Sequence, residues 1–254
     1  STSDTEVVVH LIKKSTHSPF RGKVKNALSL LKGAFSLILL TNDSMIVARD
    51  RNGLRPLSLG KLGDAYVVAS ETCAFDLIGA EYVREVEPGE LLIISNNGLE
   101  VDSFIEADKR TMCAMEYVYF ARPDSNIDGI NIHMARKRMG KELAHECAHI
   151  EADIVTGVPD SSISAAIGFS EASGIPYELG LIKNRYVGRT FIQPTQELRE
   201  RGVKMKLSPV VQVVKGKRVV MVDDSIVRGT TSKRIVRMLK EAGATEVHVA
   251  VSYT

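Results

Sequence analysis

Two adjacent carboxylates, Asp223 and Asp224, follow four apolar residues at 219–222 and precede a short loop of hydroxyl side chains and glycine. The apolar run predicts a buried parallel strand, and residues 233–242 predict a helix. A loop at a helix N-terminus presents N–H groups that bind phosphate, while carboxylates bind ribose hydroxyls or a partly hydrated Mg²⁺. The segment therefore predicts a sugar-phosphate site, although polar turns of this kind are also common in α/β proteins without such a role.

Two further polar segments follow predicted strands. The turn Pro-Asp-Ser-Ser at 159–162 follows a strand expected at 153–156, and its hydroxyls either cap the next helix or donate to a pyrophosphate. The segment 183–190 carries three cations and a glycine after a strand expected at 177–182. It is either a solvated surface or a mobile lid over a polyanion. All three segments follow strands, and ligands bind at the carboxyl ends of parallel strands.

The three segments together predict one reaction, the loss of pyrophosphate from C1 of a ribose 5-phosphate followed by addition of a nucleophile. The protein need supply no covalent nucleophile for it. It must hold the phosphates and a metal, neutralise the leaving pyrophosphate and exclude water. The acidic pair, the hydroxyl-bearing turn and the cationic segment suit these tasks.

The elements that must position these residues fall into two predicted domains, 1–110 and 111–254. In the first, two helices are followed by short strand-like runs separated by Asn-Gly and Pro-Gly turns, which indicates a mostly antiparallel β region. In the second, strands and helices alternate, which indicates a doubly wound parallel sheet. Residues 113–120 are expected to form a further strand at its start.

Composition is that of an ordinary globular protein, with a net charge of +2 and dispersed Lys and Arg, so it offers no nucleic-acid footprint. No apolar run is long enough for a membrane span, and no signal-peptide core stands at the start. The cysteines Cys73, Cys113 and Cys147 are odd in number and widely spaced, which favours a reducing, cytoplasmic setting. The start without Met and the end after an apolar run predict a piece of a longer protein.

Three strings resemble the amidophosphoribosyltransferase family: Glu116–Ser125, Gly180–Ile192 and Val219–Thr231. The resemblance covers essentially the whole chain. Within the family, the chain is similar to the bacterial form that carries an iron–sulfur cluster. The resemblance implies a partial N-terminal-nucleophile glutaminase, antiparallel with helices, followed by a C-terminally incomplete type I phosphoribosyltransferase domain. It also implies transfer of glutamine-derived ammonia to phosphoribosyl pyrophosphate (PRPP). The products would be 5-phosphoribosylamine, pyrophosphate and glutamate, in the first step of purine synthesis.

The resemblance implies roles for matching residues in the transferase part. Lys183, Tyr186 and Arg189 would lie in the catalytic loop that closes over PRPP. Asp223 and Asp224 would bind the ribose hydroxyls. The remaining PRPP-binding residues, which would cradle the 5-phosphate, are Ser225, Ile226, Val227, Arg228, Gly229, Thr230 and Thr231.

Metal and glutamine sites follow from the same resemblance. Mg²⁺ would be bound by Asp223 and Asp224, with Ser161 at the Mg²⁺–pyrophosphate position. Cys113 would be the first ligand of a [4Fe–4S] cluster. That cluster is not expected to assemble in this chain, because it needs four cysteine thiolates. Asp4 would hold the α-amino group of glutamine.

The chain also departs from the family. The family's glutaminase begins with a catalytic cysteine, whereas this chain begins with Ser1, so we expect ammonia-dependent transfer or PRPP binding at most. The resemblance implies purine nucleotides as feedback inhibitors and a homo-oligomeric parent protein. Neither a nucleic acid nor a membrane is expected as a partner. The alternatives are a non-catalytic regulator that senses PRPP, and an inert fragment.

Overall fold

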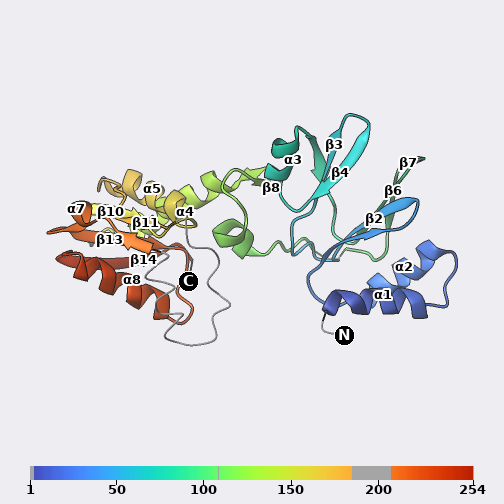
Figure 1. The fold of residues 1–254 in the computed structure, drawn as a ribbon, viewed down its shortest axis with the longest axis horizontal. Coiled ribbons are helices and arrows are strands. Elements are labelled where there is room, and N and C mark those ends of the chain that lie inside the picture. The colour runs from blue at the N-terminus through green and yellow to red at the C-terminus, as the bar shows by residue number, and fades with distance from the viewer. Residues whose placement is uncertain (1–2, 108, 185–206, 254) are drawn as a thin grey trace. The chain divides into compact units, whose positions relative to one another are not determined.

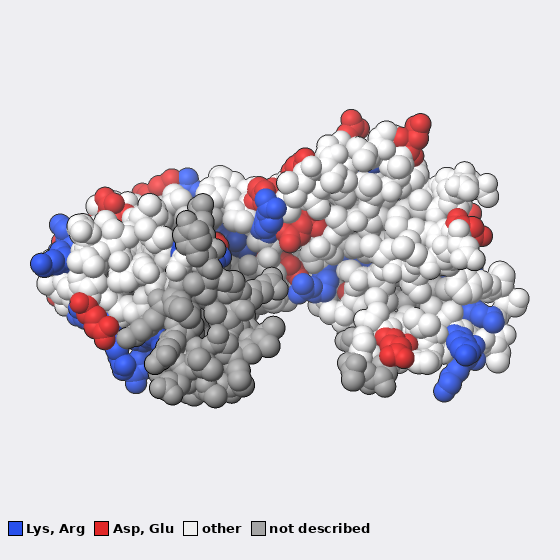
Figure 2. Space-filling model, viewed as in Figure 1, with Lys and Arg blue, Asp and Glu red and all other residues white. Residues whose placement is uncertain are grey.

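The computed structural model describes residues 3–107, 109–184 and 207–253. The chain divides into two compact units, Ser1–Glu116 with Ser125–Gly129 and Tyr117–Asp124 with Ile130–Thr254 (Figure 1). On the face drawn in Figure 2, acidic and basic side chains are interspersed over the described residues. None of the helices described is long and apolar enough to cross a bilayer.

A four-stranded antiparallel sheet of order β1-β2-β6-β7 forms the centre of the first unit. Because side chains alternate between the two faces of a strand, its central strands contribute to two cores. Ile46 and Leu91 pack with the two N-terminal helices, whereas their neighbours Val47 and Leu92 pack with the second sheet. The elements of this half are α1 (Asp4–Lys14), α2 (Phe20–Ser29), β1 (Ser36–Leu40), β2 (Ser44–Arg49), β6 (Glu90–Ser95) and β7 (Gly98–Ser103).

The second sheet of this unit has three antiparallel strands in the order β4-β3-β5. Its middle strand carries Gly60 in its interior, although glycine weakens a strand. The structure explains the glycine: a Cβ at Gly60 would lie 2.9 Å from the carbonyl oxygen of Glu81 on the neighbouring strand. The elements of this part are β3 (Ser58–Leu62), β4 (Ala65–Ala69), α3 (Cys73–Ile78) and β5 (Glu81–Glu85). The short strand β8 (Asn126–Ile127) also belongs to this unit but not to this sheet.

Arg49 is a fully buried cation at the end of β2. Its guanidinium donates to the carbonyl oxygens of Arg55 at 2.8 Å, Val86 at 2.6 Å and Gly53 at 3.1 Å. One nitrogen also lies 3.4 Å from the carboxylate of Glu85. Burial lowers the pKa of Arg49 and raises that of Glu85. The planar guanidinium thus joins the loop at 53–55 to Val86 through three carbonyls, in a fixed fork that a single ammonium group cannot reproduce.

We expect Arg49→Lys to destabilise the first unit by about 2 kcal/mol, since buried carbonyls lose their donors while the charge is kept. Chemical denaturation followed by hydrogen exchange in β2 and β6 measures the change. The matched control is Arg21→Lys, because Arg21 is about a third exposed and its ion pairs lie at the surface. That variant should change stability by less than about 1 kcal/mol. Equal effects of the two substitutions would contradict the structural role given to Arg49.

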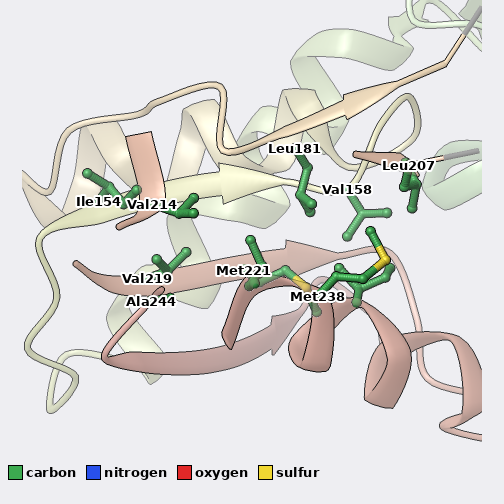
Figure 3. Close-up of a cluster of buried hydrophobic side chains, with 11 residues drawn as sticks. Ile154, Val158, Leu181, Leu207, Val214, Val219, Met221, Met238 and Ala244 are labelled. Carbon is green, nitrogen blue, oxygen red and sulfur yellow. The ribbon is translucent and has the colours of Figure 1, made fainter. Parts of the chain in front are cut away.

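The second unit contains the parallel sheet predicted from the sequence, with strand order β10-β13-β14. The central strand is buried on both faces, so its apolar run is continuous. Val219 and Met221 face a core with α8, shown in Figure 3, whereas Val220 and Val222 face α4 and α5. The elements are β9 (Ile130–Asn131), α4 (Ile132–Glu146), β10 (Ile154–Gly157), α5 (Ile163–Ser173), β11 (Leu181–Lys183), β12 (Leu207–Pro209), α7 (Val211–Val214), β13 (Arg218–Asp223), α8 (Thr230–Glu241) and β14 (Glu246–Val251).

Helices α4 and α5 approach each other through two glycines. A Cβ at Gly140 would lie 1.9 Å from the carbonyl oxygen of Ala165, and a Cβ at Gly168 would lie 1.9 Å from that of Lys137. Both distances are far inside van der Waals contact. The helices therefore pack backbone against backbone, and only glycine fits at either position.

Two predicted strands differ from the structure. Residues 113–120 were expected to form a strand, but Glu116–Phe120 forms the π-helical turn η1. The buried Arg136 of α4 donates to the carbonyl oxygens of Tyr117 at 2.6 Å and Ala121 at 2.8 Å, and this long-range contact favours the turn over local β propensity. The segment 177–182 was also expected to form one strand. Tyr177 makes only an isolated parallel bridge, and β11 begins at Leu181 and pairs antiparallel with β12.

Candidate functional site

The site is built around the two carboxylates at the end of β13. Asp223 is the last residue of the strand and is 7% exposed, while Asp224 is half-buried. The backbone N–H of Asp224 donates to Oδ1 of Asp223 at 2.9 Å. Burial, and then the adjacent charge of Asp224, raise the pKa of Asp223 to about 6. Such a pair favours a bound cation or hydroxyl donors.

The turn at 159–162 meets this pair, as the parallel pairing of β10 with β13 requires. The register places Gly157 opposite Val222, so both strands end at the same edge. Ser161 Oγ donates to Oδ2 of Asp224 at 2.6 Å, and Ser162 Oγ donates to Oδ1 of Asp223 at 3.4 Å. Ser162 is the N-cap residue of α5, but its side chain makes no capping bond. The hydroxyls thus face the acidic pair, and Ser162 occupies the N-cap position without a side-chain bond to the helix.

The loop after the carboxylates leads into the N-terminus of α8. Ser225 Oγ donates to Oδ1 of Asp224 at 2.8 Å. Gly229 is the N-cap residue with φ of 68°, a left-handed conformation that favours glycine. It has no side chain to cap the helix, and the first helical residues Thr230 and Thr231 are exposed. Their N–H groups and hydroxyls therefore lie at the positive end of a helix of 12 residues, a position that favours anions.

The other three loop residues predicted to bind PRPP are also on the surface. Ile226 is 50% and Val227 is 88% exposed. Arg228 is exposed next to them. The whole predicted loop is therefore accessible to a ligand.

Lys183 contacts the turn at 159–162 from a third segment of the chain. It is the last residue of β11, and its Nζ forms a short ion pair with Oδ2 of Asp160 in the turn. Sequence reasoning did not single out Asp160, because its partner is 23 residues away and no local pattern links the two. Tyr186 and Arg189, which were predicted to act with Lys183, lie outside the described residues.

The two remaining predicted residues belong to the first unit. Asp4 begins α1. Cys113 is partly exposed, and its backbone N–H donates to the carbonyl oxygen of Leu54 at 3.1 Å. In the part of the chain that the structure describes, no group of three or more His, Cys, Asp or Glu side chains gathers where it could hold a metal ion. The described residues therefore give Cys113 no set of companion ligands.

Comparison with protein families agrees with both halves of this description. A family model described as "Glutamine amidotransferase domain" matches residues 1–76, and one described as "Phosphoribosyl transferase domain" matches residues 127–254. The latter range contains the acidic pair, the turn at 159–162 and Lys183. The predicted fold class, a glutaminase part followed by a phosphoribosyltransferase part with a parallel sheet, is thus confirmed.

Among curated proteins, the chain is 69% identical over 252 residues to the amidophosphoribosyltransferase of Bacillus subtilis, covering 99% of this chain and 53% of the relative. It is 53% identical over 253 residues to that of Staphylococcus aureus (strain Mu50), covering 99% of this chain and 51% of the relative. The chain therefore spans about half the length of these relatives.

A solved structure of the B. subtilis protein agrees with the chain at a TM-score of 0.91 and 69% identity, covering 99% of this chain and 55% of that one. It is described as a glutamine PRPP amidotransferase complexed with ADP and GMP. These matches confirm the resemblance found in the sequence. Since the phosphoribosyl transferase model spans just over half of its residues, the chain belongs to the phosphoribosyl transferase domain family, and it is similar to the amidophosphoribosyltransferases within it.

Proposed function

We propose that the chain binds PRPP and transfers its phosphoribosyl group to ammonia, as part of an amidophosphoribosyltransferase. The bond from Ser161 Oγ to Asp224 Oδ2, at 2.6 Å, is the observation that carries this proposal. It joins a turn suited to pyrophosphate and a carboxylate pair suited to ribose at one edge of the sheet. The distance between the groups proposed to bind the pyrophosphate and the ribose of PRPP is thereby fixed before the substrate arrives.

Each group has one task in the proposed reaction. Asp223 and Asp224 accept hydrogen bonds from the ribose hydroxyls, and the loop 225–231 holds the 5-phosphate at the N-terminus of α8. Ser161 donates to the pyrophosphate side, and Lys183 neutralises the leaving pyrophosphate. Tyr186 and Arg189 are proposed to assist Lys183. As pyrophosphate leaves C1, ammonia adds to the electron-poor carbon, so the protein orients the reactants and excludes water.

The carboxylate pair fits Mg²⁺. Proteins hold this ion through one or two carboxylates, and water and substrate phosphates complete its octahedral shell. Asp223 and Asp224 supply the carboxylates, and Ser161 lies within hydrogen-bonding distance of Asp224. A bound cation offsets the cost of burying the negative charge of Asp223 and its repulsion by Asp224, the two effects that raise the pKa of Asp223. Mg²⁺ would supply charge neutralisation on the pyrophosphate.

Further roles are proposed for a longer parent protein. Asp4 is proposed to hold the α-amino group of glutamine. Cys113 is proposed as one ligand of a [4Fe–4S] cluster, which requires three thiolates besides it. Purine nucleotides are proposed as feedback inhibitors, in line with the ADP and GMP of the B. subtilis structure. We also propose a homo-oligomer in the cytoplasm, with domains at 1–110 and 111–254.

Pyrophosphate release from PRPP with Mg²⁺ tests the proposal, with ammonium chloride compared with glutamine as donor. We expect release with ammonium, because the proposed site adds ammonia at C1 of PRPP. Asp223→Asn is the control, and release should disappear in it. PRPP binding without release under either condition would instead favour a sensor of PRPP. Absence of PRPP binding would refute the proposal.

A further inference from the structure

The ion pair between Lys183 and Asp160 has no task in the reaction proposed above. Asp160 directly precedes Ser161, whose hydroxyl donates to Asp224 at 2.6 Å. The turn at 159–162 is therefore held on one side by the acidic pair and on the other by Lys183. Three segments that are distant in the sequence meet through these two contacts.

The pair leaves Lys183 already neutralised when PRPP arrives. An ammonium group offers three donors, but a pyrophosphate brought to it would also approach the carboxylate of Asp160. The ammonium group has a limited number of donors to share, so Asp160 and the pyrophosphate compete for the same cation. The side chains of Lys183 and Asp160 are 45% and 67% exposed. Exposed ion pairs are weak, so Lys183 can change partner at low cost.

We propose that Asp160 is a positioning residue: it holds Lys183 beside the pyrophosphate turn in the ligand-free chain and gives it up when pyrophosphate binds. The inference rests on the proposed function, since Lys183 must face the pyrophosphate of PRPP. It adds that, in the ligand-free site, the carboxylate of Asp160 occupies the place beside Lys183 that the pyrophosphate of PRPP takes when it binds. Release of pyrophosphate after the reaction is then assisted, because Asp160 recovers Lys183.

Isothermal titration of the full chain with Mg²⁺–pyrophosphate and with Mg²⁺–PRPP tests this exchange. Asp160→Asn removes the competing charge and keeps the shape of the side chain. We expect both ligands to bind about two- to five-fold more tightly, the range that an exposed ion pair allows. Binding of ribose 5-phosphate, which has no pyrophosphate, should not change.

The same titrations in a Lys183→Met background separate the exchange from simple repulsion. There, Asp160→Asn should no longer tighten binding, because the cation for which the two anions compete is gone. Glu171→Gln is the matched control: it removes one negative charge from an exposed ion-pair cluster of the same unit and should leave all three affinities unchanged.

Three outcomes would overturn the inference. Tightening that persists in the Lys183→Met background would mean that Asp160 acts on the ligand directly. Unchanged affinity in Asp160→Asn, with PRPP still bound by the wild-type chain, would refute the exchange and leave the proposed function standing. Failure of the wild-type chain to bind either ligand would refute both.

Discussion

Gly140→Ala is expected to destabilise the second unit by more than about 4 kcal/mol. A Cβ at this position would lie 1.9 Å from the carbonyl oxygen of Ala165, and backbone cannot move aside as a flexible side chain can. The substitution therefore forces α4 and α5 apart and disrupts the core that Leu143 and Phe169 share with the sheet. Overpacking of this kind belongs to the most damaging single substitutions. Urea denaturation followed by hydrogen exchange in α4 and α5 measures the effect.

Gly168→Ala should have a similar effect, because a Cβ there would meet the carbonyl oxygen of Lys137 at 1.9 Å. Once one substitution has separated the helices, the second costs less. The double variant should therefore lose less stability than the sum of the two single variants. Strict additivity would contradict a shared helix contact.

The matched control for both is Gly22→Ala in α2, where the nearest atom to a Cβ, that of His17, lies at an ordinary 3.5 Å. Alanine in a helix interior restricts the unfolded chain, so this variant should gain up to about 1 kcal/mol. A similar loss of stability in all three variants would show that the glycines of α4 and α5 have no special packing role.

Asp223→Asn is expected to have opposite effects on ligand binding and on the stability of the ligand-free chain. It removes one carboxylate from the pair proposed to hold ribose and Mg²⁺, so Mg²⁺-dependent PRPP binding should weaken by at least about 100-fold. Substitution of residues that merely support a metal ligand already costs about 10- to 100-fold. Titration calorimetry with Mg²⁺–PRPP measures this change.

The ligand-free chain should become more stable in the same variant at pH 8. Asp223 has a pKa of about 6 in the folded chain and 3.8 as the reference value, so folding disfavours its charged form. Stability therefore falls as pH rises from about 4 through 6, by up to about 3 kcal/mol. Asparagine avoids this loss, and its oxygen can still accept from the N–H of Asp224. The two proteins should be equally stable below pH 4 and differ by about 1 to 3 kcal/mol at pH 8.

Melting temperatures of the wild-type chain and the Asp223→Asn variant, measured from pH 4 to pH 8 without Mg²⁺ and PRPP, test the predicted gain in stability. Asp76→Asn is a suitable control, because Asp76 is an exposed carboxylate in the first unit. It should show no pH-dependent gain. A loss of stability in Asp223→Asn at pH 8 would mean that hydrogen bonds to the carboxylate outweigh its burial and its repulsion by Asp224.

Much of the second unit was predictable because its signals are local. The continuous apolar run at 219–222 specifies a strand buried on both faces, and the polar loop and helix after it follow in sequence. The same segment contains the acidic pair and most of the predicted PRPP-binding residues. Residues 113–120 were mispredicted as a strand for a different reason. There a contact from a distant segment decides the local conformation, since Arg136 holds the carbonyls of η1.

The sequence by itself determined which chemical groups the site contains and in which order the strands and helices present them. Only the tertiary structure decided which of these groups meet. Ser161 and Asp224 are 63 residues apart, and the parallel register of β10 and β13 brings them together. Burial at the strand end then raises the pKa of Asp223, and a turn across the sheet edge pairs Asp160 with Lys183. Distances and burial depend on packing between distant segments, and no local pattern of residues encodes them.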